Sequence, residues 1–150
     1  MRIERSNDTA VIASEADGSY QGAVTETQVK KKVLVVDDDP LVVRVLQEPL
    51  KKAGYEVEVA SHGLEALQKV KEKRPDLIIL DILMPLMDGF KVARFLKFDK
   101  RFKDIPIIVL TSRATEGERK MGEKVGANEF LYKPFRLPHV LDVVQRYLNA

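Results

Sequence analysis

Six side chains that could take part in phosphoryl chemistry stand directly after short apolar runs of this 150-residue chain. They are Asp37, Asp38, Asp39, Asp81, Thr111 and Lys133. Clustered carboxylates repel one another, and a hard divalent cation such as Mg²⁺ relieves that repulsion while keeping positions free for phosphate oxygens. An aspartate can itself attack phosphorus, and a lysine and a hydroxyl can bind the phosphoryl oxygens. If the fold brings these side chains together, they predict a phosphoryl-transfer site with Mg²⁺ as its cofactor.

The apolar runs that precede these side chains are typical of strands. They cover residues 33–36, 57–60, 77–80, 107–110 and 130–132. Three of the five are apolar throughout, as in strands buried on both faces of a parallel sheet, and the second and fifth suit the edges. Amphipathic stretches between the runs predict helices. These cover 41–53, a region around 64–70, 90–98, 114–125 and 137–148.

Local signals mark where the first two helices begin. Asp39 is expected to cap the first helix, which has Pro40 in its first turn and stops at Gly54. Ser61 or His62 stands near the start of the second helix. Five strand–helix units in succession predict an α/β fold with a doubly wound, five-stranded parallel sheet and helices on both faces. Ligands of such sheets bind beyond the carboxyl ends of the strands, which is where the six side chains stand.

Four motifs of the chain resemble those of the receiver domain of two-component response regulators. They are VLVVDDDP at 33–40, LDILMPLMDGF at 80–90, VLTS at 109–112 and YKPF at 132–135. All four occur in the family's order and at the matching strand ends, and the resemblance covers about residues 31–149. It implies a flavodoxin-like sheet with strand order 2-1-3-4-5.

The resemblance also implies a role for each acidic residue of the site. Asp81 would be the phosphoacceptor, taking a phosphoryl group from a phosphohistidine. Asp38 and Asp81 would bind Mg²⁺ directly, Asp37 would bind it through water, and Leu83 would contribute its backbone carbonyl. Asp39 is interpreted as a helix cap and not as a metal ligand.

A second group of residues would sense the phosphoryl group. Lys133 would pair with its oxygens, and Thr111 would hydrogen-bond to them once they arrive. Phe130 occupies the aromatic switch position and would turn inward as Thr111 moves. The resemblance further implies a cis peptide bond between Lys133 and Pro134.

The composition excludes several classes of protein. The chain has no cysteine, so disulfide scaffolds and thiolate sites are excluded, and its net charge of +2 disfavours a nucleic-acid binder driven by bulk basicity. No apolar run approaches the length of a membrane span, so we expect a soluble, cytoplasmic protein. Residues 1–31 are rich in small and polar side chains and are predicted to be a disordered or loosely docked tail, followed by a receiver domain at 32–150.

These features predict a stand-alone signalling module and not an enzyme. Its expected partners are a sensor histidine kinase or phosphotransfer protein and a downstream protein target, reached through the face formed by 114–125, 130–132 and 137–148. Two alternatives are a receiver excised from a larger regulator or hybrid kinase, and an unphosphorylated binding scaffold. A third is a small phosphohydrolase of the haloacid-dehalogenase type, which has an Asp-x-Asp motif, but Leu41 falls where that motif has Thr or Val.

Two further segments outside the site carry predictions. The helix at 114–125 is poor in apolar residues and contains Gly117 and Gly122, so we expect it to be labile and to be the soft part of the switch. Three phenylalanines, Phe95, Phe98 and Phe102, are interpreted as core and cover. The basic residues Lys97, Lys100, Arg101 and Lys103 beside them are interpreted as a solvated loop.

Overall fold

The chain forms two separate units, Met1–Lys30 and Lys31–Ala150. The computed structural model describes the backbone of residues 13–16, 19–22, 29–84, 87–112 and 115–149. In the first unit, β1 (Ala13–Ala16) pairs antiparallel with β2 (Ser19–Gly22), with Ala13 opposite Gly22. The disordered or loosely docked tail stays a prediction.

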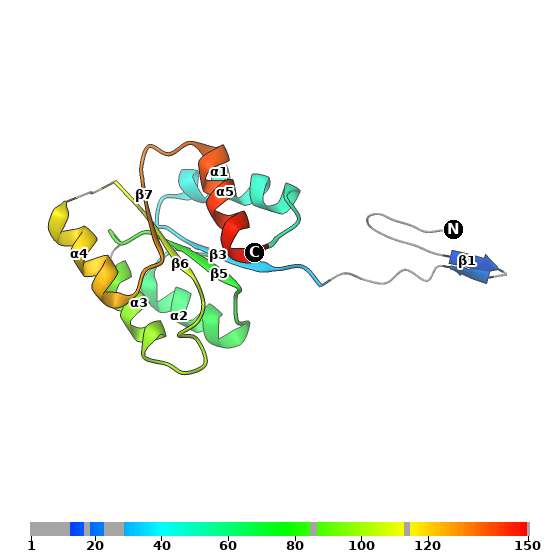
Figure 1. The fold of residues 1–150 in the computed structure, drawn as a ribbon, viewed down its shortest axis with the longest axis horizontal. Helices are drawn as coiled ribbons and strands as arrows, with labels where there is room; N and C mark the ends of the chain where they lie inside the picture. The colour runs from blue at the N-terminus through cyan, green and yellow to red at the C-terminus, as the bar shows by residue number, and fades with distance from the viewer. Residues whose placement is uncertain (1–12, 17–18, 23–28, 85–86, 113–114, 150) are drawn as a thin grey trace. The chain divides into compact units, whose positions relative to one another are not determined.

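The second unit, called the domain below, is built on a five-stranded parallel sheet (Figure 1). In chain order its strands are β3 (Lys32–Val36), β4 (Glu56–Ala60), β5 (Leu77–Leu80), β6 (Ile107–Thr111) and β7 (Glu129–Tyr132). Their order across the sheet is β4-β3-β5-β6-β7, which confirms the predicted order 2-1-3-4-5. The three central strands are the fully apolar runs, because helices cover them on both faces.

Within the described residues of the domain, five helices cover the sheet. They are α1 (Pro40–Lys52), α2 (Gly63–Glu72), α3 (Gly89–Lys97), α4 (Glu116–Val125) and α5 (Leu137–Leu148). In Figure 1, α1 and α5 lie on one face of the sheet, and α2 and α3 lie on the other. None of the described helices has both the length and the apolar character needed to cross a lipid bilayer.

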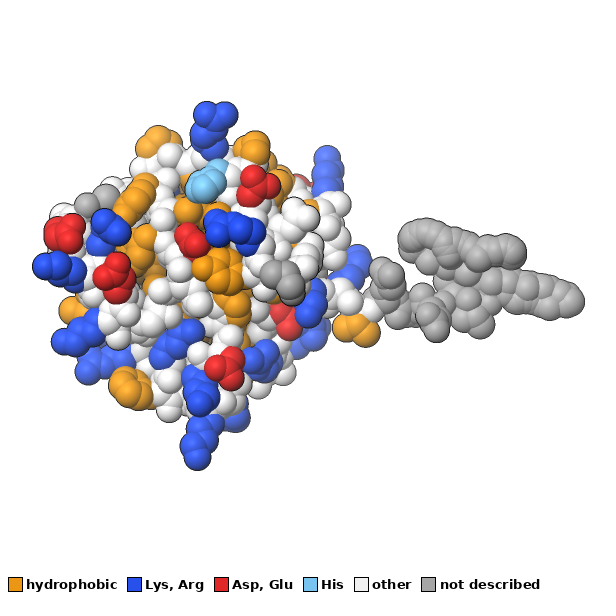
Figure 2. Space-filling view, viewed as in Figure 1, with side chains coloured by type: hydrophobic (Ala, Val, Ile, Leu, Met, Phe, Trp, Pro, Cys, Tyr) orange, Lys and Arg blue, Asp and Glu red, His pale blue; other side chains and the backbone are white. Residues whose placement is uncertain are grey.

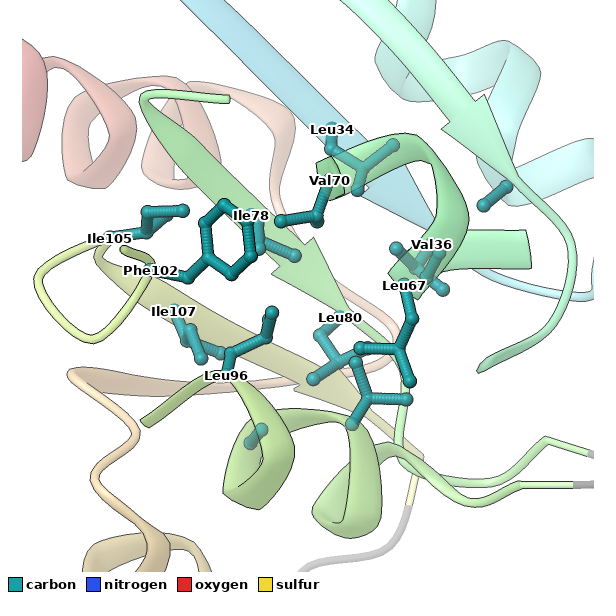
Figure 3. Close-up of a cluster of buried hydrophobic side chains, with 14 of the residues drawn as sticks. Leu34, Val36, Leu67, Val70, Ile78, Leu80, Leu96, Phe102, Ile105 and Ile107 are labelled. Atoms are coloured by element: carbon teal, nitrogen blue, oxygen red, sulfur yellow. The ribbon is translucent and has the colours of Figure 1, made fainter. Parts of the chain in front are cut away.

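The sheet separates two hydrophobic cores, because successive side chains of a strand point to opposite faces. Leu34, Ile78 and Ile107 pack towards α2 and α3, together with Phe102 and Ile105 from the loop after α3 (Figure 3). Their neighbours along the strands pack towards α1 and α5. Alternate residues of each central strand therefore tie both helix layers to the same sheet.

The helix starts agree with the local signals in the sequence. The Asp39 side chain accepts a hydrogen bond of 2.9 Å from the backbone N–H of Leu41, which confirms it as the cap of α1. The start of α2 was open between two residues, and the structure assigns the cap to His62, whose Nδ1 accepts from the backbone N–H of Glu65 at 3.2 Å.

The interpretation of the phenylalanines near α3 as core and cover is only partly right. Phe102 is buried, as expected, but Phe98 is 82% exposed and Phe95 is 52% exposed. The reason is the helical wheel of α3: Val92 and Leu96 turn towards the sheet, so the face that carries Phe95 turns away from it.

Candidate functional site

Backbone hydrogen bonds hold the residues after the strands in the sheet. The N–H of Asp37 donates to the carbonyl of Ala60 at 3.1 Å, and the N–H of Asp81 donates to the carbonyl of Val36 at 2.9 Å. The N–H of Lys133 donates to the carbonyl of Thr111 at 2.8 Å. The parallel pairing thus continues one residue past the strands, so Asp37 and Asp81 become neighbours on one edge, with Lys133 beside Thr111.

Three of the four predicted acidic residues form one cluster at this edge. Carboxylate oxygens of Asp37, Asp38 and Asp81 all lie within 4.8 Å of one another. Asp37 is 3% exposed and Asp81 is 4% exposed, whereas Asp38 faces solvent. Asp39 points away from the cluster to its capping contact, although its N–H donates to Oδ1 of Asp37 at 2.9 Å.

Lys133 follows β7, the strand at one side of the sheet, and its side chain extends to the cluster. Its Nζ lies 2.8 Å from Oδ2 of Asp37 and 3.7 Å from Oδ2 of Asp81. Burial lowers the pKa of Lys133, but the hydrogen bond to Asp37 and the charges of Asp81 and Asp37 raise it by more, so the pKa is raised overall. Lys133 is therefore a full positive charge held between two buried carboxylates. The peptide bond that follows it, Lys133–Pro134, is cis, as the resemblance implied.

The surroundings of Asp81 shift its pKa strongly. Burial raises the pKa of Asp81 to about 6, and the backbone N–H of Leu83, 3.1 Å from its Oδ1, opposes that shift. The charge of Asp37 raises this pKa further, and Lys133 lowers it. A perturbed carboxyl group in a charged cluster is the pattern expected of a functional site.

The donor set fits a hard divalent cation. Three carboxylates with oxygens this close offer only oxygen ligands, which Mg²⁺ and Ca²⁺ prefer, and Lys133 supplies a single positive charge against three negative ones. The imbalance favours a cation at this place. The backbone N–H of Leu83 donates a hydrogen bond to Asp81, and the Leu83 side chain is partly exposed.

The two predicted switch residues lie on neighbouring strands. Thr111 ends β6 and is fully buried, and Phe130 in β7 is paired in register with Val109 of β6. The Phe130 ring is half-buried, and its centroid lies 6.4 Å from that of Tyr132.

This ring makes a close contact with α4 that was not predicted from the sequence. Gly122 is the buried residue of α4, and a Cβ built on it would come within 1.9 Å of Cε2 of Phe130. The ring therefore lies directly on the helix backbone. The sequence signal for this contact was Gly122 itself. A glycine lowers helix propensity, so its presence inside a helix indicates a packing reason.

Comparison with known proteins identifies the class to which this fold and site belong. The response regulator receiver domain family matches residues 33–145, so the chain belongs to that family. Proteins of this class work in two-component signalling, are phosphorylated on an aspartate and bind Mg²⁺ in their active site.

Particular relatives agree with this assignment. The alkaline phosphatase synthesis transcriptional regulatory protein PhoP of Bacillus subtilis is 42% identical over 105 residues, which are 70% of this chain and 43% of that protein. This chain thus spans less than half the length of that relative.

Solved structures of two receivers are also similar. The chemotaxis protein CheY4 of Vibrio cholerae superimposes with a TM-score of 0.76 at 38% identity, over 80% of this chain and 100% of that one. The receiver domain of the sensor histidine kinase PA1611 of Pseudomonas aeruginosa has a TM-score of 0.74 at 29% identity, over 81% of this chain and 100% of that one. That crystal structure has a magnesium ion coordinated in the active-site cleft.

Proposed function

We propose that Asp81 is the phosphoacceptor of this receiver and that its phosphorylation switches protein–protein contacts. The phosphodonor is the phosphohistidine of a histidine kinase or phosphotransfer protein, and the transfer takes place in the cytoplasm. The observation that carries the proposal is the Asp81 carboxylate, buried beside Asp37 and Asp38 and 3.7 Å from the Lys133 ammonium.

In the proposed transfer an oxygen of ionised Asp81 attacks phosphorus in line with the bond to the donor imidazole. The new O–P bond forms as the N–P bond breaks, and the imidazole leaves with the bonding electron pair. In this proposal Lys133 binds a phosphoryl oxygen, which is supported by its contact with Asp37, since that contact orients the ammonium at the cluster before transfer. When bound by Asp38, Asp81 and the carbonyl of Leu83, and by Asp37 through water, Mg²⁺ would supply the positive charge that offsets the incoming oxygens.

Once Asp81 is phosphorylated, Thr111 is the hydroxyl expected to hydrogen-bond to the new oxygens. We propose that movement of Thr111 lets Phe130 turn inward and changes the surface of α4, β7 and α5, which a downstream protein reads. Only the phosphorylated arrangement gains these bonds, so they supply the differential free energy that a population shift requires. Apart from gaining and losing its own phosphoryl group, the chain is proposed not to be an enzyme.

One specific alternative concerns how the phosphorylated receiver passes on its signal. PhoP is by name a transcriptional regulatory protein, and this chain matches only 43% of it. The same receiver, as part of a larger regulator or hybrid kinase, would pass the switch to an attached domain through the same face. A protein contact made by the receiver surface is the first step in both versions.

The direct test is the mass of the intact protein after incubation with acetyl phosphate, with and without Mg²⁺. Wild type should gain one phosphoryl group in the presence of Mg²⁺, and Asp81→Asn should gain none. The matched control is Asp39→Asn, which alters the helix cap and should still be phosphorylated. If wild type gains nothing under either condition, the chain is a binding scaffold. If it instead hydrolyses a chromogenic phosphate ester with turnover, it is a phosphohydrolase.

A further inference from the structure

The outer side of α3 carries an open groove of about 720 Å³. We call it the α3 groove, and its lining residues are Met87, Lys91, Arg94, Phe95, Phe98, Asp99 and Lys100. It is not made by the residues that build the phosphoryl site or by the face of α4, β7 and α5. A role in the proposed switch therefore does not explain why this groove is present.

The aromatic side chains of the groove are exposed by the geometry of the helix. Lys91, Phe95 and Phe98 follow one another at spacings of four and three residues, which places them along one side of α3. Val92 and Leu96 face the sheet, so they already provide the contact of α3 with the core. The outward phenylalanines contribute little to that core, and exposed apolar patches rimmed by polar residues mark interaction sites.

The rim of the groove is positively charged. Within the described part of the chain, the side chains of Lys91, Arg94 and Lys100 have no carboxylate in ion-pair distance. The acidic residue of the rim, Asp99, is already occupied, because Arg101 donates to both of its oxygens at 3.1 and 2.8 Å.

The positive charge extends beyond the rim. Nζ of Lys71 on α2 lies 5.8 Å from the centroid of the Phe95 ring. Lys and Arg side chains gather over the lower part of the domain in Figure 2, where Figure 1 shows α2 and α3. A partner that fits this surface has negative charge around an apolar centre.

The groove is held in shape by the loop that follows α3. Nζ of Lys97 donates to the carbonyls of Lys103 and Ile105, each at 3.0 Å, and Phe102 of this loop is buried in the core. The guanidinium of Arg101 lies 4.7 Å from the centroid of the Phe102 ring. These contacts fix the end of the groove next to Phe98, so a ligand meets a preformed surface and less ordering entropy opposes its binding.

We propose that the α3 groove is a docking site for an acidic peptide segment of a partner protein, anchored by an aromatic or aliphatic side chain between Phe95 and Phe98. The occupant is chosen on charge complementarity: Lys91, Arg94 and Lys100, which have no ion-pair partner among the described residues, line the groove with the two rings. Acidic residues that flank the anchor are therefore attracted and basic ones are repelled. Short helical or extended segments bind such grooves through one or two apolar anchors. Docking there leaves the phosphoryl site and the α4, β7 and α5 face accessible to other partners.

The test is a selection from a displayed library of random peptides against the unphosphorylated wild-type full-length chain, after depletion on its Phe98→Ser variant. Selected peptides should be rich in Asp and Glu around a Phe, Leu or Trp anchor. Phe98→Ser and Arg94→Glu should each weaken the binding of a selected peptide at least tenfold. The affinity should also fall between about 50 and about 300 mM salt, because screening weakens attraction between exposed charges.

Two matched variants control for general loss of apolar area and of charge. Leu64→Ser removes another exposed apolar side chain, on α2, and Lys51→Glu reverses an exposed charge on α1; both should leave the affinity within twofold. Circular dichroism and unfolding curves identify any variant that fails to fold. If Phe98→Ser fails to fold, Phe95→Ser is tested in its place.

Three results would overturn the proposal. The selected peptides could bind Phe98→Ser as well as wild type, or could carry no excess of acidic residues. A DNA duplex could bind the groove with the same dependence on Phe98 and Arg94. The domain could also self-associate in sedimentation and lose that association in Phe98→Ser. None of these results bears on phosphorylation of Asp81, because the selection uses the unphosphorylated protein.

Discussion

Lys133 faces its two carboxylate partners at unequal distances, and this asymmetry bears on its role. It is hydrogen-bonded to Asp37 at 2.8 Å and lies 3.7 Å from Asp81. A phosphoryl oxygen on Asp81 would therefore compete with Asp37 for an ammonium that is already oriented. Before phosphorylation the same ammonium offsets part of the repulsion within the carboxylate cluster.

The first prediction concerns a variant that lacks this ammonium group. Lys133→Met should lower the free energy of unfolding at pH 7 by about 2 kcal/mol without Mg²⁺, because two buried carboxylates lose their cation; the loss is smaller than for a fully buried pair because Lys133 is partly exposed. Urea unfolding measures it. The loss should shrink at pH 5, where Asp81 protonates more readily. An equal loss in Lys51→Met, whose side chain is exposed, would contradict this explanation.

The second prediction concerns the pKa of Asp81. Burial raises this pKa to about 6 in the folded domain, above its ordinary value of 3.8. Folding thus disfavours the ionised form, and this penalty appears as the pH rises above about 4 and is complete above about 6. Asp81→Asn should therefore raise the free energy of unfolding at pH 7 without Mg²⁺ by on the order of 3 kcal/mol.

The difference between wild type and Asp81→Asn should vanish below about pH 4, because Asp81 is then neutral in both the folded and the unfolded chain. Unfolding curves collected from pH 3 to pH 8 measure it. A gain in stability that is the same at every pH would show that the effect comes from packing and not from charge.

At the scale of elements, α4 is the helix least tied to the core. Gly122 is its buried residue among the described ones, and Phe130 of β7 lies on that glycine. The contact joins the predicted switch residue to the helix backbone. A change in the position of the ring must therefore change how α4 packs, which gives the predicted switch a physical route from β7 to the surface.

The third prediction compares the two glycines of α4. A Cβ at Gly117 meets nothing within 4 Å, so Gly117→Ala should stabilise the domain by up to about 1 kcal/mol through helix propensity. Gly122→Ala forces the Phe130 ring to move, and this overpacking costs about 1–3 kcal/mol, which exceeds the gain in propensity.

Unfolding curves measure both glycine variants, and the NMR signals of the Phe130 ring report its displacement in Gly122→Ala. Equal stabilisation by the two alanines, with an unmoved ring, would show that the ring does not depend on Gly122.

The fourth prediction concerns the local stability of α4. Because few of its side chains enter the core, its amides should exchange with solvent faster than those of β5, whose four residues are all buried. Phosphorylation should slow the exchange of α4. Hydrogen exchange in the unphosphorylated domain that protects α4 as well as β5 would remove it as the soft part of the switch.

Much of the architecture could be predicted because each strand carries its own signal. The fully apolar runs at β5 and β6 required two covered faces, and Asp39 with Pro40 marked the start of α1. The clustering of the acidic residues followed from parallel topology, since strand ends meet at one edge.

What could not be predicted depends on which elements meet in space. Both stripes of α3 contain apolar residues, and only its contact with the sheet decides that Leu96 is buried and Phe95 is exposed. In the same way Gly122 and Phe130 lie on different elements, so the glycine indicates a close contact but does not identify Phe130 as its partner. The roles of Asp81, Thr111, Lys133 and Phe130 in the switch stay predictions.

At the scale of the whole domain, the site joins strands that belong to both hydrophobic cores. Asp37 follows β3 and Asp81 follows β5, and each of these strands sends alternate side chains towards α2 and α3 and towards α1 and α5. A cation that binds the cluster therefore restrains both helix layers through the sheet. Its effect should be visible in global unfolding and not only in the loops around it.

The fifth prediction follows from this connection. We expect Mg²⁺ to bind the folded domain, because the three carboxylates converge only there, and to raise the free energy of unfolding by about 2.7 kcal/mol at a hundredfold excess over its dissociation constant. Removal of the ion with EDTA should reverse the gain. Asp38→Asn should weaken the effect, whereas Asp39→Asn should keep it. Equal stabilisation of all variants would point to a general salt effect.

The backbone bonds of Asp37, Asp81 and Lys133 extend the sheet by one residue at its carboxyl edge. The proposed reacting groups are thereby anchored to the sheet by backbone hydrogen bonds, whereas the helices of the proposed partner surfaces pack on the sheet through side chains. Mutations on those helices can alter what the domain recognises without disturbing its chemistry. In evolutionary terms, such a module can be rewired to new signalling circuits while its reaction centre is inherited intact.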